Sequence, residues 1–512
     1  MVRLVYGLAL ISLVLPFLLQ HPVYEPHRDE FLYLAEGRHL AWGYLEAPPL
    51  LSVLSFLTNA LGAGFFWIKL WPALFGAMTY VLVGRMILLL GGGRQALLLG
   101  FLPFVFGFFL RVHFLLEPGF LGMYFQTLMA YGLVRFLRTG KPGGLYLVGI
   151  GFGLGALSQY TTLLFSLGLL VGLLLTPERK VLRNPHLHFA LILGGLLFLP
   201  NVIWQALHEW PMFGSLRGWR PEAGHALGFA RDQLVFELPG IFILAAGLYG
   251  LFRMPGYRQW RCLGWAVIVA LGLSMVFWVT PVDALGVYPV LLVFGAMAAA
   301  SDRMSSIGGE TRRRAWRYGV IGFAVVTGCV VDSLALPMLP PRALAATYAR
   351  MPMVRQLGFL RWEDGRDHAL PQNFADMLGW EEMALKAAKA YDLLDSLDKT
   401  GVLLNSRGNY GEGGALDYYG PKYLLPPVMG RGADYLLWTP PAYYDRDVFI
   451  VTTKDRQELK GCASTIIVDS VTHPYSTEYR SYIILIRATN AAVRQEWKKE
   501  DSAAQRRQLA AR

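Results

Sequence analysis

The sequence has few cysteines and few charged residues. Only three of its 512 residues are cysteines, Cys262, Cys329 and Cys462, and this small number excludes a fold held together by a framework of disulfides. Only 16% of the residues are charged, whereas soluble domains have about a quarter. Because 54% of the residues are hydrophobic as well, the composition excludes a soluble globular protein.

Basic residues outnumber acidic ones, 47 to 36, which gives a formal net charge of +11. In a soluble chain this excess would suggest a nucleic-acid partner, but in an apolar chain the positions of the charges matter more than their sum. Most cations of the apolar part lie in alternate short loops: Arg94; Arg135, Arg138 and Lys141; Arg179, Lys180 and Arg183; Arg253, Arg258 and Arg261; Arg303, Arg312, Arg313, Arg314 and Arg317. With a cytoplasmic N-terminus, all these loops are cytoplasmic, as the positive-inside rule requires. We therefore expect no nucleic-acid partner.

Apolar runs close to the length of a membrane-spanning helix recur up to about residue 338. The first run could be a signal peptide, but no A-x-A site precedes Gln20 and further runs follow, so we interpret it as a span. One kinked helix across Tyr160–Thr162 is an alternative that would reverse the orientation of all later loops. Hydropathy predicts a polytopic α-helical protein with about 11 spans, in a range of roughly 10 to 13, at residues 4–19, 65–90, 95–110, 119–137, 145–158, 161–176, 187–206, 237–252, 262–280, 284–300 and 318–337.

The loops opposite the basic ones hold most of the membrane-proximal acids and histidines. They are residues 21–64, 111–118, 207–236 and 281–283, and we expect them outside the cell membrane together with the chain beyond 338. An external chain without disulfides is typical of a bacterial inner-membrane protein with a periplasmic domain, although a eukaryotic organelle is the alternative.

We divide the chain into a transmembrane domain, residues 1–338, and a soluble C-terminal α/β domain, residues 339–512. The final stretch, 490–512, is charged and is predicted to be a frayed helix. The tail contains helix-like stretches at 380–397 and 414–419 and strand-like apolar runs at Gly401–Leu404, Tyr435–Trp438, Val448–Thr452, Thr465–Val468 and Tyr482–Ile486.

The first external loop is unusually rich in ionisable residues. In the stretch from Asp29 to Tyr44, a helical phase places Asp29, Tyr33 and Glu36 on roughly one face. Such a helix, lying on the membrane with its carboxylates at the level of the headgroups, would hold a lipid-linked substrate. The alternative is a loop that is polar only because it is solvated.

Several motifs of this chain resemble those of the GT-C integral-membrane glycosyltransferases, in particular the bacterial branch related to protein O-mannosyltransferases and the lipid A aminoarabinose transferase. The resemblance covers most of residues 1–440. Its first motif, in the first external loop, consists of Arg28-Asp29-Glu30, Tyr33, His39 to Tyr44 and Glu46 to Leu50. The later motifs are Arg111 to Pro118, Gly153 to Thr161, Pro200 to Pro211 and Asn409 to Tyr423.

This resemblance implies transfer of a sugar from a polyprenyl-phosphate carrier to a lipid, glycan or protein acceptor at the external face, usually with inversion. Because the leaving group is an ionised phosphate, the reaction needs a carboxylate to accept the proton of the acceptor hydroxyl. It also needs cations for the phosphate and an apolar groove for the prenyl tail.

The resemblance implies that Asp29 is the central acid, a base or acceptor-orienting group, and that Glu30 is its motif partner. Since adjacent residues diverge on a helix, one of the two is expected to react and the other to position. The alternative for Asp29 is a helix-start residue that stabilises backbone N–H groups. Arg28 and Tyr33 are expected to bind substrate as parts of the same motif.

Glu46 corresponds to a glutamate implicated in metal contact in the aminoarabinose transferase. It could bind a divalent cation together with His208. The alternative, a polar residue before the Pro48–Pro49 turn, is about as well supported by the sequence.

Further substrate-binding candidates lie in the other external loops: Arg111, His113, Glu117, Arg217, Arg220, Asp283 and Tyr288. Arg111 is suited to phosphate through its planar donors, whereas simple hydration or surface charge is the alternative for these loop residues. The family often has lysines where this chain has Gln159 and Thr280. Three explanations are open: arginines bind the phosphate instead, the sugar carrier differs, or the enzyme is less active.

Two other interpretations remain open at this point. The Gly-rich run 408–414 could bind an anion, but it lacks a lysine at the required spacing, and a tight turn is favoured. The whole chain could instead be a transporter, flippase or binding protein for lipid-linked sugars; a transporter would need ionisable groups near the bilayer midplane and an inverted repeat.

Overall fold

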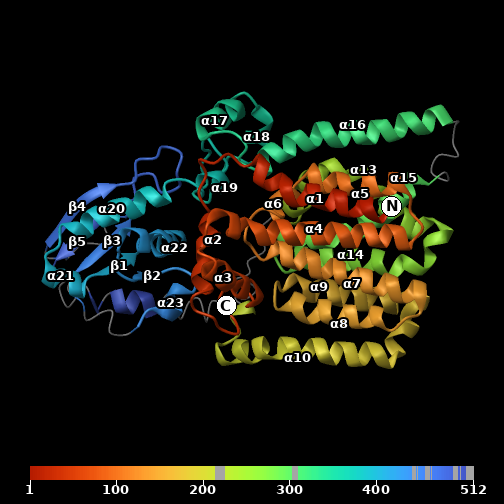
Figure 1. The fold of residues 1–512 in the computed structure, drawn as a ribbon, viewed down its shortest axis with the longest axis horizontal. Coiled ribbons are helices and arrows are strands. Elements are labelled where there is room, and N and C mark those ends of the chain that lie inside the picture. Colours follow the sequence, from red (N-terminus) through yellow and green to blue (C-terminus); the bar gives the residue numbers. More distant parts are fainter. Residues whose placement is uncertain are drawn as a thin grey trace.

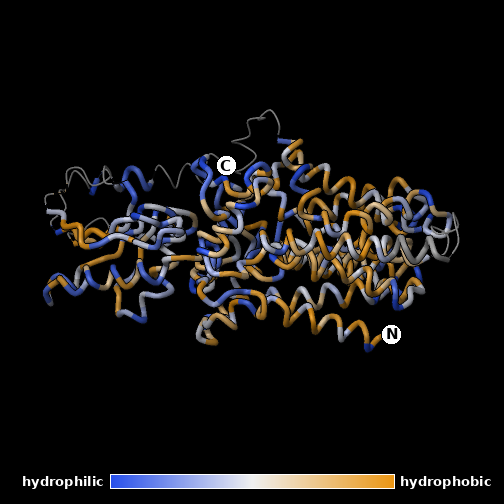
Figure 2. Tube along the Cα trace, turned by 90° about the horizontal axis from the view of Figure 1, so that it is seen from above, coloured by the Kyte–Doolittle hydropathy of each residue, from blue (hydrophilic) through white to orange (hydrophobic). Residues whose placement is uncertain are grey.

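The structure, a computed structural model, consists of a long helical bundle and a smaller α/β region at one end of the bundle (Figure 1). It describes residues 1–213, 225–301, 310–440, 446, 448–455, 462, 464–487, 494–495 and 497–502. Hydrophobic residues follow the bundle helices, whereas hydrophilic residues gather toward the α/β end (Figure 2). This distribution is that of a multi-pass membrane protein with a water-exposed region.

The bundle is built from the apolar runs. A helix occupies each range predicted as a span: α1 Val2–Leu19, α4 Phe65–Leu89, α5 Arg94–Val105, α7 Gly119–Thr139, α8 Gly143–Ala156, α9 Thr161–Leu174, α10 Pro185–Leu207, α13 Ile241–Arg253, α14 Arg261–Val276, α15 Tyr288–Ala300 and α16 Glu310–Ala335. A short segment, Leu157–Tyr160, separates α8 from α9, so the sequence there does not form one kinked helix.

Small residues allow the bundle helices to pack closely. A Cβ atom on Gly153 of α8 would lie 2.6 Å from the carbonyl oxygen of Gly194 in α10, which only glycine at this position tolerates. In a membrane, such small residues at an interface let two backbones approach and gain van der Waals contact. This contact explains why α10 lies along the flank of the bundle next to α8 (Figure 1).

Six helices in the described part of the chain are long and apolar enough to cross a membrane, or up to eight if each of two bent pairs forms one span. The bent pairs are Thr161–Leu174 with Pro177–Arg183, at 116°, and His225–Phe236 (α12) with Leu238–Arg253, at 66°. The shorter apolar helices include Arg94–Val105 and Gly143–Ala156. The predicted number of spans, about 11, therefore stays a prediction.

The C-terminal region contains a five-stranded sheet in the order β2-β1-β3-β5-β4. Strand β1 pairs in parallel with β2 and β3, and β5 pairs antiparallel with β3 and β4. The strands are β1 Leu403–Ser406, β2 Val428–Gly430, β3 Phe449–Thr453, β4 Ser464–Ser470 and β5 Tyr482–Arg487; the helices are α17 Pro341–Ala349, α18 Pro352–Gln356, α19 Gln372–Ala375, α20 Trp380–Asp392, α21 Ser396–Gly401, α22 Tyr410–Tyr419 and α23 Tyr435–Trp438.

Two details of the predicted tail are wrong. Tyr435–Trp438 forms the short helix α23 instead of a strand, because a short apolar run reads the same way in a buried helix and in a buried strand. The strand Val428–Gly430 was not predicted, since three residues carry too little pattern. The Gly-rich run continues into α22, and at the start of this helix the side chain of Asn409 accepts a hydrogen bond from the Glu412 N–H.

Three short helices connect the bundle with the tail: α2 Arg28–Glu36, α3 Leu50–Ala60 and α6 Phe109–Val112. Helix α2 packs against α22 and most of its residues are buried, so it is not an isolated surface helix; its position at the headgroup level stays a prediction. Phe31 of α2 contacts the Trp380 ring edge-on, with 5.9 Å between centroids. The acidic helix therefore lies between the bundle and the tail (Figure 1).

Candidate active site

A cavity of about 1000 Å³ opens beside the N-terminal end of α2. One part of its wall is polar and includes Asp29, Tyr33, Glu46, Arg111, Glu117 and Asp283. Another part is apolar and includes Leu163, Leu164, Met212, Phe213, Phe277, Val279 and Val282. A cavity with charged groups on one side and apolar side chains on the other suits an amphiphilic ligand.

The start of α2 is fixed by a capping box that leaves Asp29 free for other contacts. The His27 imidazole accepts a hydrogen bond from the Asp29 N–H at 3.3 Å, and the Glu30 carboxylate accepts one from the His27 N–H at 2.8 Å. In such a box the capping residue and the third helical residue satisfy the exposed N–H groups. His27 and Glu30 therefore carry out the capping role that was the alternative for Asp29.

The Asp29 carboxylate has two differently engaged oxygens. Its Oδ1 accepts a hydrogen bond from the Tyr410 hydroxyl at 2.6 Å and lies 3.5 Å from the Arg28 Nε. Its Oδ2 lies 3.5 Å from the His27 Nδ1. Burial opposes ionisation, but charged and hydrogen-bonding neighbours, among them Arg28 and Tyr410, outweigh burial and hold the pKa of Asp29 below its ordinary value. Asp29 is therefore a carboxylate at neutral pH.

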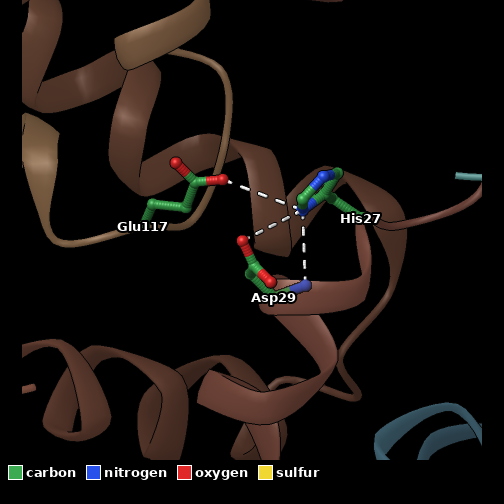
Figure 3. Close-up of side chains that lie close together, drawn as sticks. All are labelled: His27, Asp29 and Glu117. Carbon is green, nitrogen blue, oxygen red and sulfur yellow. Dashed lines mark hydrogen bonds and ion pairs between the residues drawn. The ribbon is translucent and has the colours of Figure 1, made fainter. Parts of the chain in front are cut away.

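Glu117 faces Asp29 from the loop before α7 (Figure 3). Its Oε2 lies 3.3 Å from the Arg111 Nη1, and its Oε1 lies 3.8 Å from the His27 Nδ1 without a hydrogen-bond partner. Burial raises the pKa of Glu117 to about 7, although the Arg111 charge opposes this shift. Two neighbouring carboxyls with pKa values pushed apart are a typical arrangement for proton transfer, with Asp29 ionised and Glu117 titrating near neutrality.

His27, Asp29 and Glu117 could also hold a metal ion. Within the described residues they form a group whose ligand atoms lie within 4.8 Å of one another. One imidazole nitrogen and two carboxylate oxygens suit zinc or manganese. The unpartnered Glu117 Oε1 fits this role. Of the predicted metal pair, Glu46 lines the cavity, but His208 does not; its ring stacks on Trp204 at 4.0 Å between centroids.

Several other predicted site residues lie away from the cavity wall. The Glu30 carboxylate is buried and accepts two hydrogen bonds from the Lys69 Nζ, both at 2.6 Å. Arg28 pairs with Glu363 and Asp376 of the tail. The His113 ring is buried and stacks on Phe104, and the Tyr288 hydroxyl donates to Gln233; Arg217 and Arg220 lie outside the described residues.

The two positions at which the family often has lysines both contact Asp283. The Gln159 amide donates to the Asp283 Oδ1 at 2.7 Å, and the Thr280 hydroxyl donates to the Asp283 Oδ2 at 2.6 Å. All three residues line the cavity. Among the described residues of the cavity wall, Arg111 is the one lysine or arginine, so it is the group best suited to a phosphate there.

Comparison with known proteins agrees with this architecture. Residues 46–204 match the model of the dolichyl-phosphate-mannose-protein mannosyltransferase family. The fold is similar to that of ArnT from Cupriavidus metallidurans bound to undecaprenyl phosphate, at 15% sequence identity and a TM-score of 0.56, over 96% of this chain and 98% of that chain. This chain has the GT-C fold. This fold and the family match over residues 46–204 agree with the superfamily expected from the motifs.

Two weaker similarities to GT-C proteins involve an archaeal oligosaccharyltransferase. AglB from Archaeoglobus fulgidus, in complex with an inhibitory peptide and a dolichol-phosphate, matches at 12% identity and a TM-score of 0.47, over 81% of this chain and 63% of that chain. The Archaeoglobus fulgidus oligosaccharyltransferase in complex with zinc and sulfate matches at 13% identity and a TM-score of 0.45, over 81% and 61%. No curated protein matches the chain in sequence.

Two residues that contact the acidic residues of this site were not assigned a role from the sequence. Tyr410 lies in a motif of the resemblance, but nothing local indicates that its hydroxyl contacts Asp29, 381 residues away. Lys69 belongs to an apolar run, where a lysine is costly unless it is paired. That cost is a usable signal, because the buried acid that satisfies Lys69, Glu30, lies in the most acidic loop of the chain.

The tail also meets α2 through a buried carboxyl pair. Glu36 accepts a hydrogen bond from the Ser52 hydroxyl at 2.6 Å, and the Asp434 carboxylate accepts one from the Leu45 N–H at 2.8 Å. Burial, together with the nearby charge of Asp434, raises the pKa of Glu36 well above its ordinary value of 4.5. While Glu36 keeps its proton, it does not repel the buried charge of Asp434. The contact between the tail and the cavity-lining segment around Leu45 is therefore strongest in this protonation state.

Replacing Glu36 with Gln is expected to stabilise the protein at high pH. As pH rises above 4.5 the unfolded chain releases the Glu36 proton while the folded chain keeps it, so stability is lost as pH approaches the raised folded pKa. Gln stays neutral and avoids this loss. Unfolding followed by tryptophan fluorescence should show a higher unfolding midpoint for Glu36→Gln than for the wild type at pH ~8. At pH ~5 the difference between the two midpoints should be much smaller.

Glu381→Gln is the matched control for this prediction. Glu381 contacts Lys422 and Tyr423, and these hydrogen bonds lower its pKa, so the replacement should bring no gain at high pH. A Glu36→Gln variant with the same loss of stability between the two pH values as the wild type would show that Glu36 does not carry the buried proton.

Proposed function

We propose that this protein is a glycosyltransferase that moves a sugar from a polyprenyl-phosphate carrier to an envelope acceptor at the outer face of a bacterial inner membrane. The observation that carries this proposal is the placement of an ionised carboxylate, Asp29, in a cavity that also has an arginine and an apolar wall. These are the three elements that the reaction requires. The GT-C fold and the match to a polyprenyl-phosphate-dependent family support it.

In this reaction Asp29 acts as the general base. As the acceptor oxygen attacks the anomeric carbon, its proton moves to the Asp29 Oδ2, the oxygen not engaged by Tyr410. The bond between the anomeric carbon and the phosphate oxygen breaks, and the polyprenyl phosphate leaves with the electron pair. Attack from the side opposite the phosphate inverts the anomeric configuration.

Arg111 is the group that stabilises the leaving phosphate. Its guanidinium is buried and lies 3.3 Å from Glu117, which holds it at the cavity wall. Arginine donors form short charge-assisted hydrogen bonds to phosphate oxygens. The apolar wall around Leu163, Leu164 and Phe277 would accommodate the first prenyl units, and Tyr33, Glu46 and Asp283 would contact the sugar.

A divalent cation fits the same site. His27, Asp29 and Glu117 would hold it, and when bound it would supply positive charge for the leaving phosphate. Arg111 would contact the phosphate with or without the ion. Asp29 would act as the base when no ion occupies its Oδ2, the oxygen that faces His27. We assign the tail, from about residue 339, to the periplasmic side, because it adjoins the external ends of the bundle that form this cavity (Figure 1).

The direct test uses purified protein in lipid nanodiscs with a radiolabelled polyprenyl-phosphate sugar and a membrane extract as the acceptor source. We expect the label to move to an extract component and free polyprenyl phosphate to form in equal amount. Parallel reactions with a chelator and with added manganese or zinc measure metal dependence. In sealed vesicles, movement of the intact donor across the bilayer without transfer would identify a flippase, and donor binding alone would identify a binding protein.

A further inference from the structure

Tyr410, a residue of the C-terminal region, reaches the carboxylate that we assign as the base. It is the first residue of α22, whose start is fixed by the Asn409 side chain. The Tyr410 hydroxyl donates to the Asp29 Oδ1 at 2.6 Å, the usual length of a charge-assisted hydrogen bond from a hydroxyl to a carboxylate. Tyr410 itself does not line the cavity. It therefore acts on the site through Asp29.

The hydrogen bond decides which oxygen of Asp29 is left for other contacts. With Oδ1 held by Tyr410 and near the Arg28 Nε, the remaining oxygen, Oδ2, is the one turned toward His27 and Glu117. Arg28 also lies over the Tyr410 ring, 5.6 Å from its centroid. The planar carboxylate is thus fixed in rotation by donors on one side, which is the arrangement a base needs to meet a proton at one defined place.

The position of Tyr410 depends on close packing between α22 and α2. A Cβ atom on Gly414 would lie 2.7 Å from the Cβ of Phe31, and one on Gly411 would lie 2.9 Å from the Cβ of Arg28. Arg28 in turn pairs with Glu363 and Asp376 of the tail. The tail is therefore seated directly on the helix that carries Asp29, and it contributes a group to the first contact shell of that residue.

We propose that Tyr410 is a positioning residue for Asp29, so that the site is complete only when the C-terminal region is docked on α2. This inference rests on the proposed transferase function. It assigns the tail a direct part in the chemical step, in addition to any role in binding an acceptor.

Kinetics of Tyr410→Phe test this proposal against a matched control. Tyr423→Phe removes a similar hydroxyl, which donates to Glu381 at 2.9 Å on the tail and outside the cavity. Loss of a hydrogen bond to a charged group should lower kcat by about tenfold or more in Tyr410→Phe, because the carboxylate is free to rotate. The KM for the donor should stay within about twofold, and Tyr423→Phe should match the wild type.

A second measurement examines the contact without any turnover. With 3-fluorotyrosine placed at position 410, the fluorine resonance should shift when Asp29 is replaced by Asn and stay unchanged with Glu381→Gln. Full kcat in Tyr410→Phe, or a resonance insensitive to Asp29, would overturn the proposal. If wild-type protein transfers no sugar, the proposed function fails, and the fluorine result alone then decides whether Tyr410 holds Asp29.

Discussion

Replacing Asp29 with Asn is expected to reduce sugar transfer by a factor of about 100 to 10,000, the usual contribution of a positioned general base. Asn has nearly the same shape, and its side-chain oxygen still accepts a hydrogen bond from Tyr410. It has no lone pair basic enough to take the proton of an acceptor hydroxyl. The chemical step should therefore fail while the fold and donor binding persist, and initial transfer rates at saturating donor measure this directly.

Asp364→Asn is a suitable control for this experiment. Asp364 is an exposed carboxylate of the tail that pairs with His368, and its replacement should change neither rate nor stability measurably. If Asp29 were instead a structural residue of the helix start, Asp29→Asn would lower the unfolding temperature and leave the rate per folded molecule unchanged. The capping box formed by His27 and Glu30 argues for the kinetic outcome.

Much of the fold follows from hydrophobicity alone. The apolar runs became helices because a buried backbone without water must pair its own polar groups within one segment. The alternating apolar runs of the tail likewise gave β1, β3, β4 and β5 close to their predicted bounds. The conformation of short elements such as Tyr435–Trp438 was not predicted correctly, since it depends on contacts with residues distant in sequence.

The candidate site was predictable only in its local parts. Asp29, Arg111 and Glu117 come from motifs of neighbouring residues, and the structure places all three on one cavity. The grouping of His27 with Asp29 and Glu117 arises from how two loops meet, which no spacing within one loop reveals. The Tyr410 contact crosses from the tail to the first loop for the same reason. The roles of these site residues in transfer stay predictions.

The largest expected effect on stability comes from the buried ion pair of Lys69 and Glu30. Both side chains are at most 1% exposed, and Glu30 also accepts hydrogen bonds from the backbone N–H groups of His27 and Leu116. Replacing Lys69 with Met leaves a buried carboxylate without its cation, which typically costs about 3 to 5 kcal/mol. We therefore expect a strongly lowered unfolding midpoint in mild detergent, with loss of transfer activity.

Arg85→Met provides the control on the same helix. Arg85 donates to the Tyr6 hydroxyl at an exposed position, so its loss should change the free energy of unfolding by less than about 1 kcal/mol. A Lys69→Met variant as stable as Arg85→Met would show that the pair is not buried as described.

The double variant Glu30→Gln with Lys69→Met separates charge from geometry. It removes the unpaired charge, so much of the lost stability should return, because replacing both members of a buried pair costs less than removing one. Activity should recover less than stability does. The Glu30 carboxylate accepts hydrogen bonds from the backbone N–H of His27, two residues before Asp29, and of Leu116, one residue before Glu117. It therefore helps to set the distance between Asp29 and Glu117. Gln accepts with one oxygen where the carboxylate uses two, so α2 and the loop before α7 should lose their common anchor even when the core is neutral.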